Sequence, residues 1–278
     1  SYNNNFGEHS INALAGIEAL SQRGKGKGIT VNGFLFETPD FYLLSNGSGA
    51  PIVSYAYDGT STLYSVFGTA NYNYGGKYYL TGTLRRDKSS RFQGDNQSGV
   101  FPSVSAGWVI SEEDFFPDSV VSRLKLNASW GELGNQTLPV GNPTINISRL
   151  SNQFGNYVFN GSGTPTTGAI LTAVGNPDLN WETSITKNIG LNLGLFDDKL
   201  DATLEFYEIT TKDLITQNNS LISTTAIDAN APYVNLGSIQ NTGVDFSLGY
   251  QNTAASGFNY GFNLNISHYR NEVLVHIH

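Results

Sequence analysis

Apolar and polar residues alternate along much of the chain, which is the pattern of a β-strand with two different faces. The alternation is clearest in segment 258–266, where aromatic and aliphatic residues occupy every second position. The apolar residues are Phe258, Tyr260, Phe262, Leu264 and Ile266, and those between them are Asn259, Gly261, Asn263 and Asn265. One face of this strand is therefore apolar, and the other carries amides and glycine.

Similar alternation elsewhere brings the prediction to about nine strands. The other segments are 9–20, which is the weakest, 64–72, 78–84, 100–110, 124–130, 185–193, 200–206 and 244–250. Gly75-Gly76, Asp197-Asp198 and the stretch 251–257 concentrate turn-forming residues. We therefore expect the strands on either side of each to form hairpins.

The predicted links between these strands alternate in length. Short links fall near 74–76, 111–122, 196–199 and 251–257, and long links near 21–61, 87–98, 133–179 and 212–239. Outer-membrane β-barrels have short periplasmic turns and longer extracellular loops. The pattern thus predicts an all-β fold, an antiparallel transmembrane β-barrel of which this chain forms a part.

Composition supports a membrane that is crossed by strands. Only 14% of the residues are charged, yet the mean hydropathy is -0.23. No apolar run approaches the ~20 residues of a transmembrane helix, whereas a membrane strand needs about 9–11 residues, every second one apolar. The net charge of -8 argues against nucleic acid as a partner. Because position 1 is Ser and Met is absent, we expect the sequence to be a piece of a longer chain.

Aromatic residues near strand ends suggest the girdles that barrels place at both membrane interfaces. Tyr72, Tyr74, Tyr78 and Tyr79 cluster around one turn, and Trp181 stands where a strand begins. Tyr is also a common strand residue, so the clustering carries this interpretation. Lys187 falls on an apolar face, where a mid-membrane Lys would cost roughly 2–4 kcal/mol. We therefore place Lys187 at the outer headgroup level.

Five strings along the chain resemble one known family. They are residues 83–92 (TLRRDKSSRF), 99–108 (GVFPSVSAGW), 124–131 (LKLNASWG), 175–183 (GNPDLNWET) and 188–192 (NIGLN). Together, and in this order, they resemble the SusC/RagA branch of TonB-dependent outer-membrane transporters, with the resemblance extending from about residue 8 to 271.

The resemblance implies a 22-stranded barrel with an N-terminal plug, in the outer membrane of a Gram-negative bacterium. Such transporters are coupled to TonB through the plug and import large nutrients, mostly glycans and sometimes peptides, beneath a SusD-type lipoprotein lid. We expect residues 1–278 to be a portion of the barrel domain, with the plug absent from this chain.

No catalytic or cofactor-binding constellation is evident. The basic stretch 24–28 lacks a phosphate-binding frame, and nothing pairs a Ser with a positioned His. The acidic run 112–114 has no EF-hand spacing and is expected to cap a turn. Without Cys, a thiolate metal site is impossible. We expect no enzyme, no metal and no cofactor.

Glycan capture needs aromatic faces beside amides. The loop candidates for this role are Tyr55, Tyr57, Asn152, Phe154, Tyr157 and Phe159. For any one of them, packing within the loop is the commoner role. The rival hypothesis is a soluble or surface β-sandwich that binds carbohydrate or mediates adhesion, in which the apolar faces would meet in a core.

The barrel hypothesis predicts which way side chains point. Leu191, Leu193, Phe246, Leu248, Phe262 and Leu264 should face lipid, and Asn192, Asp245, Asn263 and Asn265 the lumen. Arg85, Arg86, Asp87 and Arg91 should lie at the outer rim, because charges are unfavourable in hydrocarbon.

Overall fold

The structure of the chain is a computed structural model. It describes residues 1–36, 38–117, 120–138, 143–158, 163, 166–221 and 229–274, with only the backbone described at 54–55, 149–157, 167 and 221. No helix in these ranges is long and apolar enough to cross a membrane.

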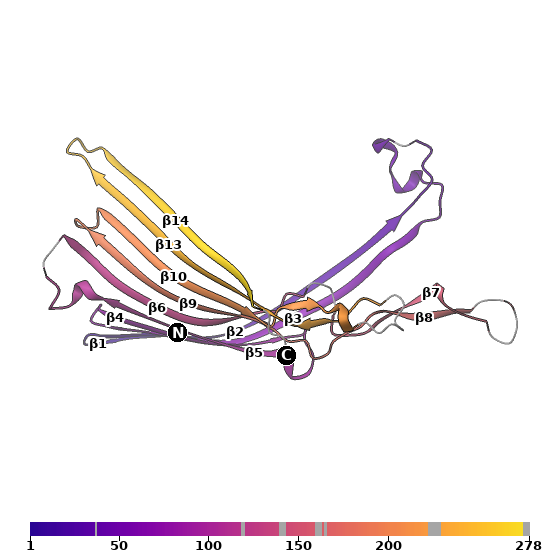
Figure 1. Cartoon of the computed structure of the whole chain (residues 1–278), viewed down its shortest axis with the longest axis horizontal. Coiled ribbons are helices and arrows are strands. Elements are labelled where there is room, and N and C mark those ends of the chain that lie inside the picture. Colours follow the sequence, from indigo (N-terminus) through magenta and orange to yellow (C-terminus); the bar gives the residue numbers. More distant parts are fainter. Residues whose placement is uncertain are drawn as a thin grey trace.

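One antiparallel sheet of ten strands dominates the structure, in the order β1-β2-β3-β4-β5-β6-β9-β10-β13-β14 (Figure 1). Its strands are β1 (Tyr2–Phe6), β2 (His9–Thr30), β3 (Ile52–Tyr74), β4 (Tyr78–Ser89), β5 (Ser98–Val109), β6 (Val121–Asn135), β9 (Glu182–Leu195), β10 (Leu200–Lys212), β13 (Ser238–Thr253) and β14 (Asn259–Leu274). Strands that follow one another in the sequence mostly pair directly, as in a meander. The sheet is open, with β1 and β14 at its edges.

Two small hairpins lie within the long links. One pairs β7 (Ile147–Tyr157) with β8 (Thr166–Ala173), and the other pairs β11 (Ile215–Gln217) with β12 (Tyr233–Asn235). The sequence pattern missed these four strands and β1. The strands β1, β11 and β12 are too short to show alternation, and β7 and β8 do not alternate apolar and polar residues. All nine predicted segments fall on strands of the main sheet, except for the end residues Ile110 and Phe258.

The turn predicted at Gly75-Gly76 and the turn predicted at Asp197-Asp198 are both confirmed. Gly75 and Gly76 have positive φ values of 59° and 71° between β3 and β4, a conformation that glycine adopts without steric cost. Asp197 and Asp198 also have positive φ, 58° and 57°, between β9 and β10.

The expected loop bounds need correction. Residues 21–30 and 52–61 of the predicted loop 21–61 are strand, because β2 and β3 continue as a hairpin to Thr30 and from Ile52. The link between β4 and β5 covers only residues 90–97, fewer than the residues 110–120 between β5 and β6. Link length therefore does not separate the two ends strictly. The three longest links, 31–51, 136–181 and 213–237, do lie at the same end of the sheet (Figure 1).

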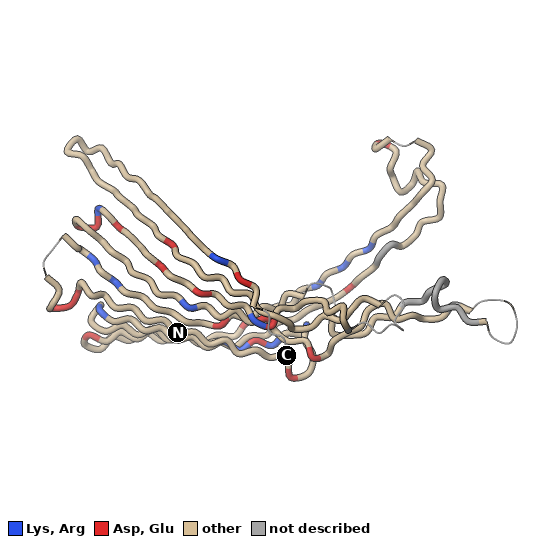
Figure 2. The backbone as a smooth tube through the Cα atoms, viewed as in Figure 1, with Lys and Arg blue, Asp and Glu red and all other residues tan. Residues whose placement is uncertain are grey.

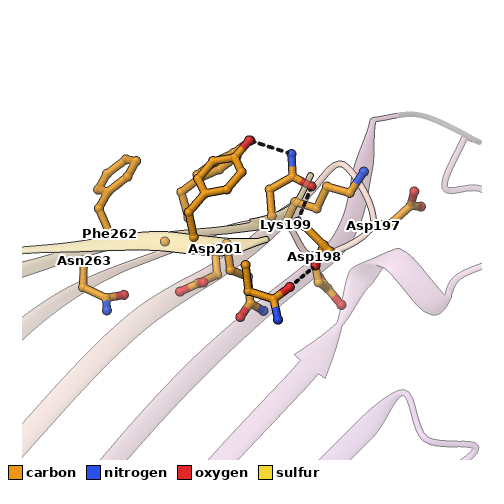
Figure 3. Close-up of a pocket in the computed structure, with 13 residues that line it drawn as sticks. Asp197, Asp198, Lys199, Asp201, Phe262 and Asn263 are labelled. Carbon is orange, nitrogen blue, oxygen red and sulfur yellow. Dashed lines mark hydrogen bonds between the residues drawn. The ribbon is translucent and has the colours of Figure 1, made fainter. Parts of the chain in front are cut away.

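The predicted two-faced pattern is present. In the register, Leu193 lies opposite Ala202, Ala202 opposite Leu248, and Leu248 opposite Leu264. One residue along, Asn192, Thr203, Ser247 and Asn265 form the neighbouring row. Because successive residues of a strand point to opposite faces, the first row lies on an apolar face and the second on a polar face. In Figure 3, Phe262 and Asn263 point to opposite sides of their strand.

The apolar face is exposed. Large apolar residues with about half or more of their surface exposed follow this face across β2, β3, β4, β9, β10 and β14; they include Ile17, Val66, Leu80, Leu84, Ile189, Phe206, Phe262 and Ile266. Phe262 itself is 53% exposed. No second sheet packs on this face in the part of the chain that the structure describes. A β-sandwich would bury these residues, so the rival fold is wrong.

Candidate functional site

The polar face carries a ladder of amides and hydroxyls that bond across strands. Thr81 Oγ1 donates to Asn71 Oδ1 at 2.8 Å, from β4 to β3. Asn127 of β6 donates to Asn192, whose Nδ2 donates to Thr203 Oγ1 at 3.0 Å. A shallow hollow of about 340 Å³ lies over this ladder. Such a face satisfies its own hydrogen bonds and can also exchange them with water or a polar solute.

A charged cluster lies on the same face toward the long-link end, centred on Arg85 of β4. Arg85 Nη2 donates to Glu18 Oε2 and to Ser65 Oγ, each at 2.8 Å, and its Nε donates to Asp87 Oδ1 at 2.7 Å. The guanidinium also lies over the Phe67 ring, 5.5 Å from its centroid. These four contacts hold the Arg85 side chain in one position, so we interpret Arg85 as a residue that stabilises the sheet.

The predicted charge string is at the expected end of the sheet. Arg85, Arg86 and Asp87 lie in the part of β4 far from the short turn 75–77, and Arg91 follows the end of β4. Arg85 and Asp87 share the polar face, whereas Arg86 points to the apolar side. The sequence analysis missed Glu18 and Ser65 as partners, although both occupy polar-face positions.

Rings cover the short-turn end of the apolar face. Phe6 and His9 stack with centroids 5.1 Å apart, His9 and Tyr74 lie 4.8 Å apart, and Tyr74 and Tyr78 6.3 Å apart. Trp108 continues the row, 6.4 Å from Tyr78. This row crosses β1 to β5 and matches an aromatic girdle.

Glu113 anchors the girdle from the link 110–120. Its Oε1 accepts hydrogen bonds from Tyr78 Oη and from Trp108 Nε1, the latter at 2.8 Å, and its Oε2 lies 3.4 Å from Lys77 Nζ. The Tyr78 hydrogen bond, followed by that of Trp108, lowers the pKa of the Glu113 carboxyl below its ordinary value. The acidic run was expected to cap a turn, and Glu113 instead joins the turn to two girdle rings.

Tyr79 and Trp181 do not belong to this row. Tyr79 points to the polar face, where Lys125 Nζ lies 4.7 Å from the centroid of its ring. Trp181 is only 4% exposed and packs against Phe92 and Phe101, with centroids 5.2 and 5.4 Å away. Its Nε1 donates to the Asn96 carbonyl at 3.1 Å. The expectation that Trp181 belongs to a girdle is wrong, because long links at this end supply chain to cover it.

Lys187 has a partner on the apolar face. Its Nζ lies 2.7 Å from Glu208 Oε1 on β10, and in the register it is opposite Trp130 of β6. An ion pair beside an aromatic ring fits the membrane boundary, where rings with polar tips concentrate. This environment supports the expected headgroup-level position of Lys187, which stays a prediction.

A second hollow, of about 800 Å³, lies at the short-turn end between the β9–β10 turn and the β13–β14 hairpin (Figure 3). Its lining includes Asp197, Asp198 and Asp201. Asp198 Oδ1 accepts from Ser122 Oγ at 2.9 Å, and Ser122 Oγ in turn accepts from the Asp198 backbone N–H. Asp198 therefore holds the turn against β6.

The loop candidates for ligand binding are only partly placed. Tyr57 lies on the β3 extension, 59% exposed, with its ring against Gly26 of β2. The backbone of Tyr55 is in β3 and that of Asn152, Phe154 and Tyr157 in β7, while their side chains lie outside the described residues. Phe159 lies outside them altogether. Tyr57 and the β7 segment belong to different hairpins.

A two-faced antiparallel sheet with an exposed apolar face, a polar face and an aromatic row defines the wall of a transmembrane β-barrel. The family described as TonB dependent receptor-like, beta-barrel, matches residues 2–274. The chain belongs to this family, whose members are outer-membrane barrels of Gram-negative bacteria and not enzymes.

Curated relatives agree with the family. The chain is 33% identical over 220 residues to the TonB-dependent receptor SusC of Bacteroides thetaiotaomicron, covering 78% of this chain and 21% of the relative. It is 30% identical over 274 residues to the TonB-dependent receptor P3 of Formosa agariphila, covering 98% and 26%. The chain thus spans about a quarter of the length of the curated relatives it matches.

Solved structures show the same architecture. A structure of the RagAB peptide transporter matches with a TM-score of 0.77 and 27% identity, over 99% of this chain and 29% of that one. The outer-membrane transporter YddB of Escherichia coli matches with a TM-score of 0.61 at 11% identity, over 98% of this chain and 32% of that one, which indicates a shared fold.

Proposed function

We propose that the chain is part of the wall of a TonB-dependent transporter that imports a large nutrient, a glycan or comparable oligomer. The observation that carries the proposal is the polar face, where amides and hydroxyls predominate along β4 to β10. Amides and hydroxyls exchange hydrogen bonds readily with sugar hydroxyls. A fixed, unpaired charged side chain would instead bind a solute strongly and hold it in place. Arg85 supports this argument, because its charge is neutralised by Glu18 and Asp87.

The loops supply the capture step in this proposal. Tyr57 and the candidates Tyr55, Asn152, Phe154, Tyr157 and Phe159 combine rings with amides, the mixture suited to sugar faces and hydroxyls. A SusD-type lipoprotein lid would close over these loops and hand in the nutrient. Energy would come from TonB acting on a plug, while residues 1–278 contribute barrel wall and loops.

A peptide is the second candidate cargo, favoured by the likeness to the RagAB peptide transporter. Growth on defined nutrients separates the two. Cells that depend on the intact receptor would be supplied either with oligosaccharides or with oligopeptides as sole source. Growth on oligosaccharides alone supports the proposal, and growth on peptides alone overturns the glycan assignment. Uptake that continues in a strain without TonB overturns the coupling mechanism.

The β7–β8 hairpin offers a sharper test of capture. Ile147 and Ala173 are register partners at its base, so removal of residues 148–172 and closure with a short Gly-Ser linker leaves the flanking chain undisturbed. We expect barrel insertion to persist while nutrient capture or lid association falls at least tenfold. A matched control removes residues 34–47 at the tip of the β2–β3 hairpin, where Phe34 and Gly47 form a bridge. Unchanged uptake and lid association after the β7–β8 deletion would contradict the role of this hairpin.

A further inference from the structure

Cations outnumber anions on one sector of the lipid-facing surface. The cations are Arg23, Lys25 and Lys27 on β2 and Arg86 and Lys88 on β4, all exposed. The three on β2 are visible as successive blue segments along the rising hairpin (Figure 2). Their spacing of two residues places each set on a single face, the face that carries Ile17, Val66 and Leu84.

The position of these cations relative to the membrane follows from two tyrosine rings of β3. Tyr64 and Tyr74 lie on the apolar face at the two ends of the apolar stretch. The strand between them rises about 33 Å, which at a tilt of ~45° spans about 23 Å of height, close to the ~25 Å apolar band of a barrel. Lys88 is the register partner of Tyr64, so it lies at the boundary nearer the long links. Arg86, opposite Val66, lies one step inside and can extend its long side chain to that boundary.

Most of these cations have no ion-pair partner among the residues that the structure describes. Arg23 and Lys25 share Asp58, at 2.7 and 3.4 Å. Within the described part of the chain, Lys27, Arg86 and Lys88 form no ion pair. On the opposite sector of the same face, Lys187 is paired with Glu208 and Arg270 with Glu272. A cation at a membrane boundary is stabilised by a nearby anion. Strands lie on both sides of β4 in the sheet, so an anion that pairs with Arg86 and Lys88 would come from outside the sheet.

We propose that the outward face of β2–β4 binds the phosphate-bearing headgroup of an outer-leaflet lipid. Lys88 and Arg86 bind phosphate at the membrane boundary, and Arg23, Lys25 and Lys27 meet the anionic layer above it. A protein lid would cover the mouth, whereas these side chains point away from the lumen. The inference relies on the membrane orientation of the proposed function and on nothing about its cargo.

The test uses the intact receptor in nanodiscs that contain either lipid A or its dephosphorylated form. Each cation near an anionic leaflet contributes about fivefold in binding, so R86Q/K88Q should lower retention of lipid A about 25-fold. R86K/K88R keeps both charges and should retain the lipid. K187Q/E208Q removes an internally neutral pair from the opposite sector and serves as the control, with little change expected. Retention is measured by native mass spectrometry.

Three results would overturn the proposal. One is equal retention by wild type and R86Q/K88Q, and another is equal retention of lipid A and its dephosphorylated form. The third is loss of lid association with lipid retention unchanged, which would make the surface a protein-docking site. Nutrient uptake is recorded in the same variants. A transporter that imports no glycan but still loses lipid A on R86Q/K88Q separates failure of the proposed function from failure of this inference.

Discussion

The two ends of the sheet use aromatic residues on opposite faces. At the short-turn end, His9, Tyr74, Tyr78 and Trp108 form a row on the lipid-facing side, with Glu113 bonded to two of them. At the long-link end, Phe92, Phe101 and Trp181 form a buried cluster against the polar side.

The two ends show that the length of the neighbouring link determines whether an aromatic ring lies at the membrane interface or in a buried core. A short turn has too few residues to cover the neighbouring rings. These rings therefore remain at the membrane interface, with their polar groups hydrogen-bonded. Long links fold back over the polar face, and rings beneath them become a small core that anchors the links. Leu63, Leu138 and Ile215 complete this core. Each end can therefore be perturbed separately.

The largest expected effect is at the long-link end. Trp181→Ala removes a buried indole and should destabilise the anchored links by about 3–5 kcal/mol, through lost packing and a cavity. The measurement is limited proteolysis of the intact receptor, which should become much faster in the links while the barrel resists unfolding. Trp108→Ala, at the other end, is the control and should leave link proteolysis near wild type. Equal proteolysis of wild type and Trp181→Ala would show that the cluster anchors nothing.

The second-largest effect is expected at the Arg85 cluster. Arg85→Ala leaves Asp87, whose side chain is 11% exposed, without its cation and should cost about 2 kcal/mol. Arg85→Lys keeps the charge but loses the fork that reaches three acceptors at once, so it should recover only part of the loss. Urea unfolding in detergent micelles measures both. Full recovery by Lys would mean that charge alone matters at this position.

At the short-turn end, Glu113 should make stability depend on pH. Its carboxyl has a folded-state pKa lowered below the ordinary 4.5, mainly by Tyr78. The charged form is therefore favoured by folding, and its contribution is present above about pH 4.5 and lost as pH falls through the lowered value. Wild type should exceed Glu113→Gln in stability at pH 7, and the gap should close in acid. A gap that is constant down to pH 3 would contradict the assignment.

The smallest effect is expected at Lys187. The pair with Glu208 is exposed, at 60% and 36% for the two side chains, so its coupling should be at most about 1 kcal/mol. A double-mutant cycle with Lys187→Gln and Glu208→Gln in micelles measures it. A coupling several times larger would indicate that the pair lies deeper in the hydrocarbon than the boundary position.

How much the sequence could predict depends on the range of the interaction. Alternation in 244–250 and 258–266 correctly predicted a hairpin and its two faces, because side-chain direction follows from the backbone at each residue. The Gly75-Gly76 turn was also predicted correctly, because it depends on two adjacent residues. Residues 21–30 and 52–61 were expected to be loop, since Gly, Ser and Lys conceal a hairpin whose strands stabilise each other by pairing.

The strand faces, the turns and the family can be predicted from the sequence, because each is encoded in nearby residues or in a linear string. Tertiary structure alone decided that Trp181 is core, that Arg85 meets Glu18 and Ser65, and that Glu113 joins Tyr78 and Trp108. Arg85 and Glu18 are 67 positions apart in the sequence, and strand register brings them to 2.8 Å. Register depends on all the intervening pairings, so no local pattern specifies such contacts.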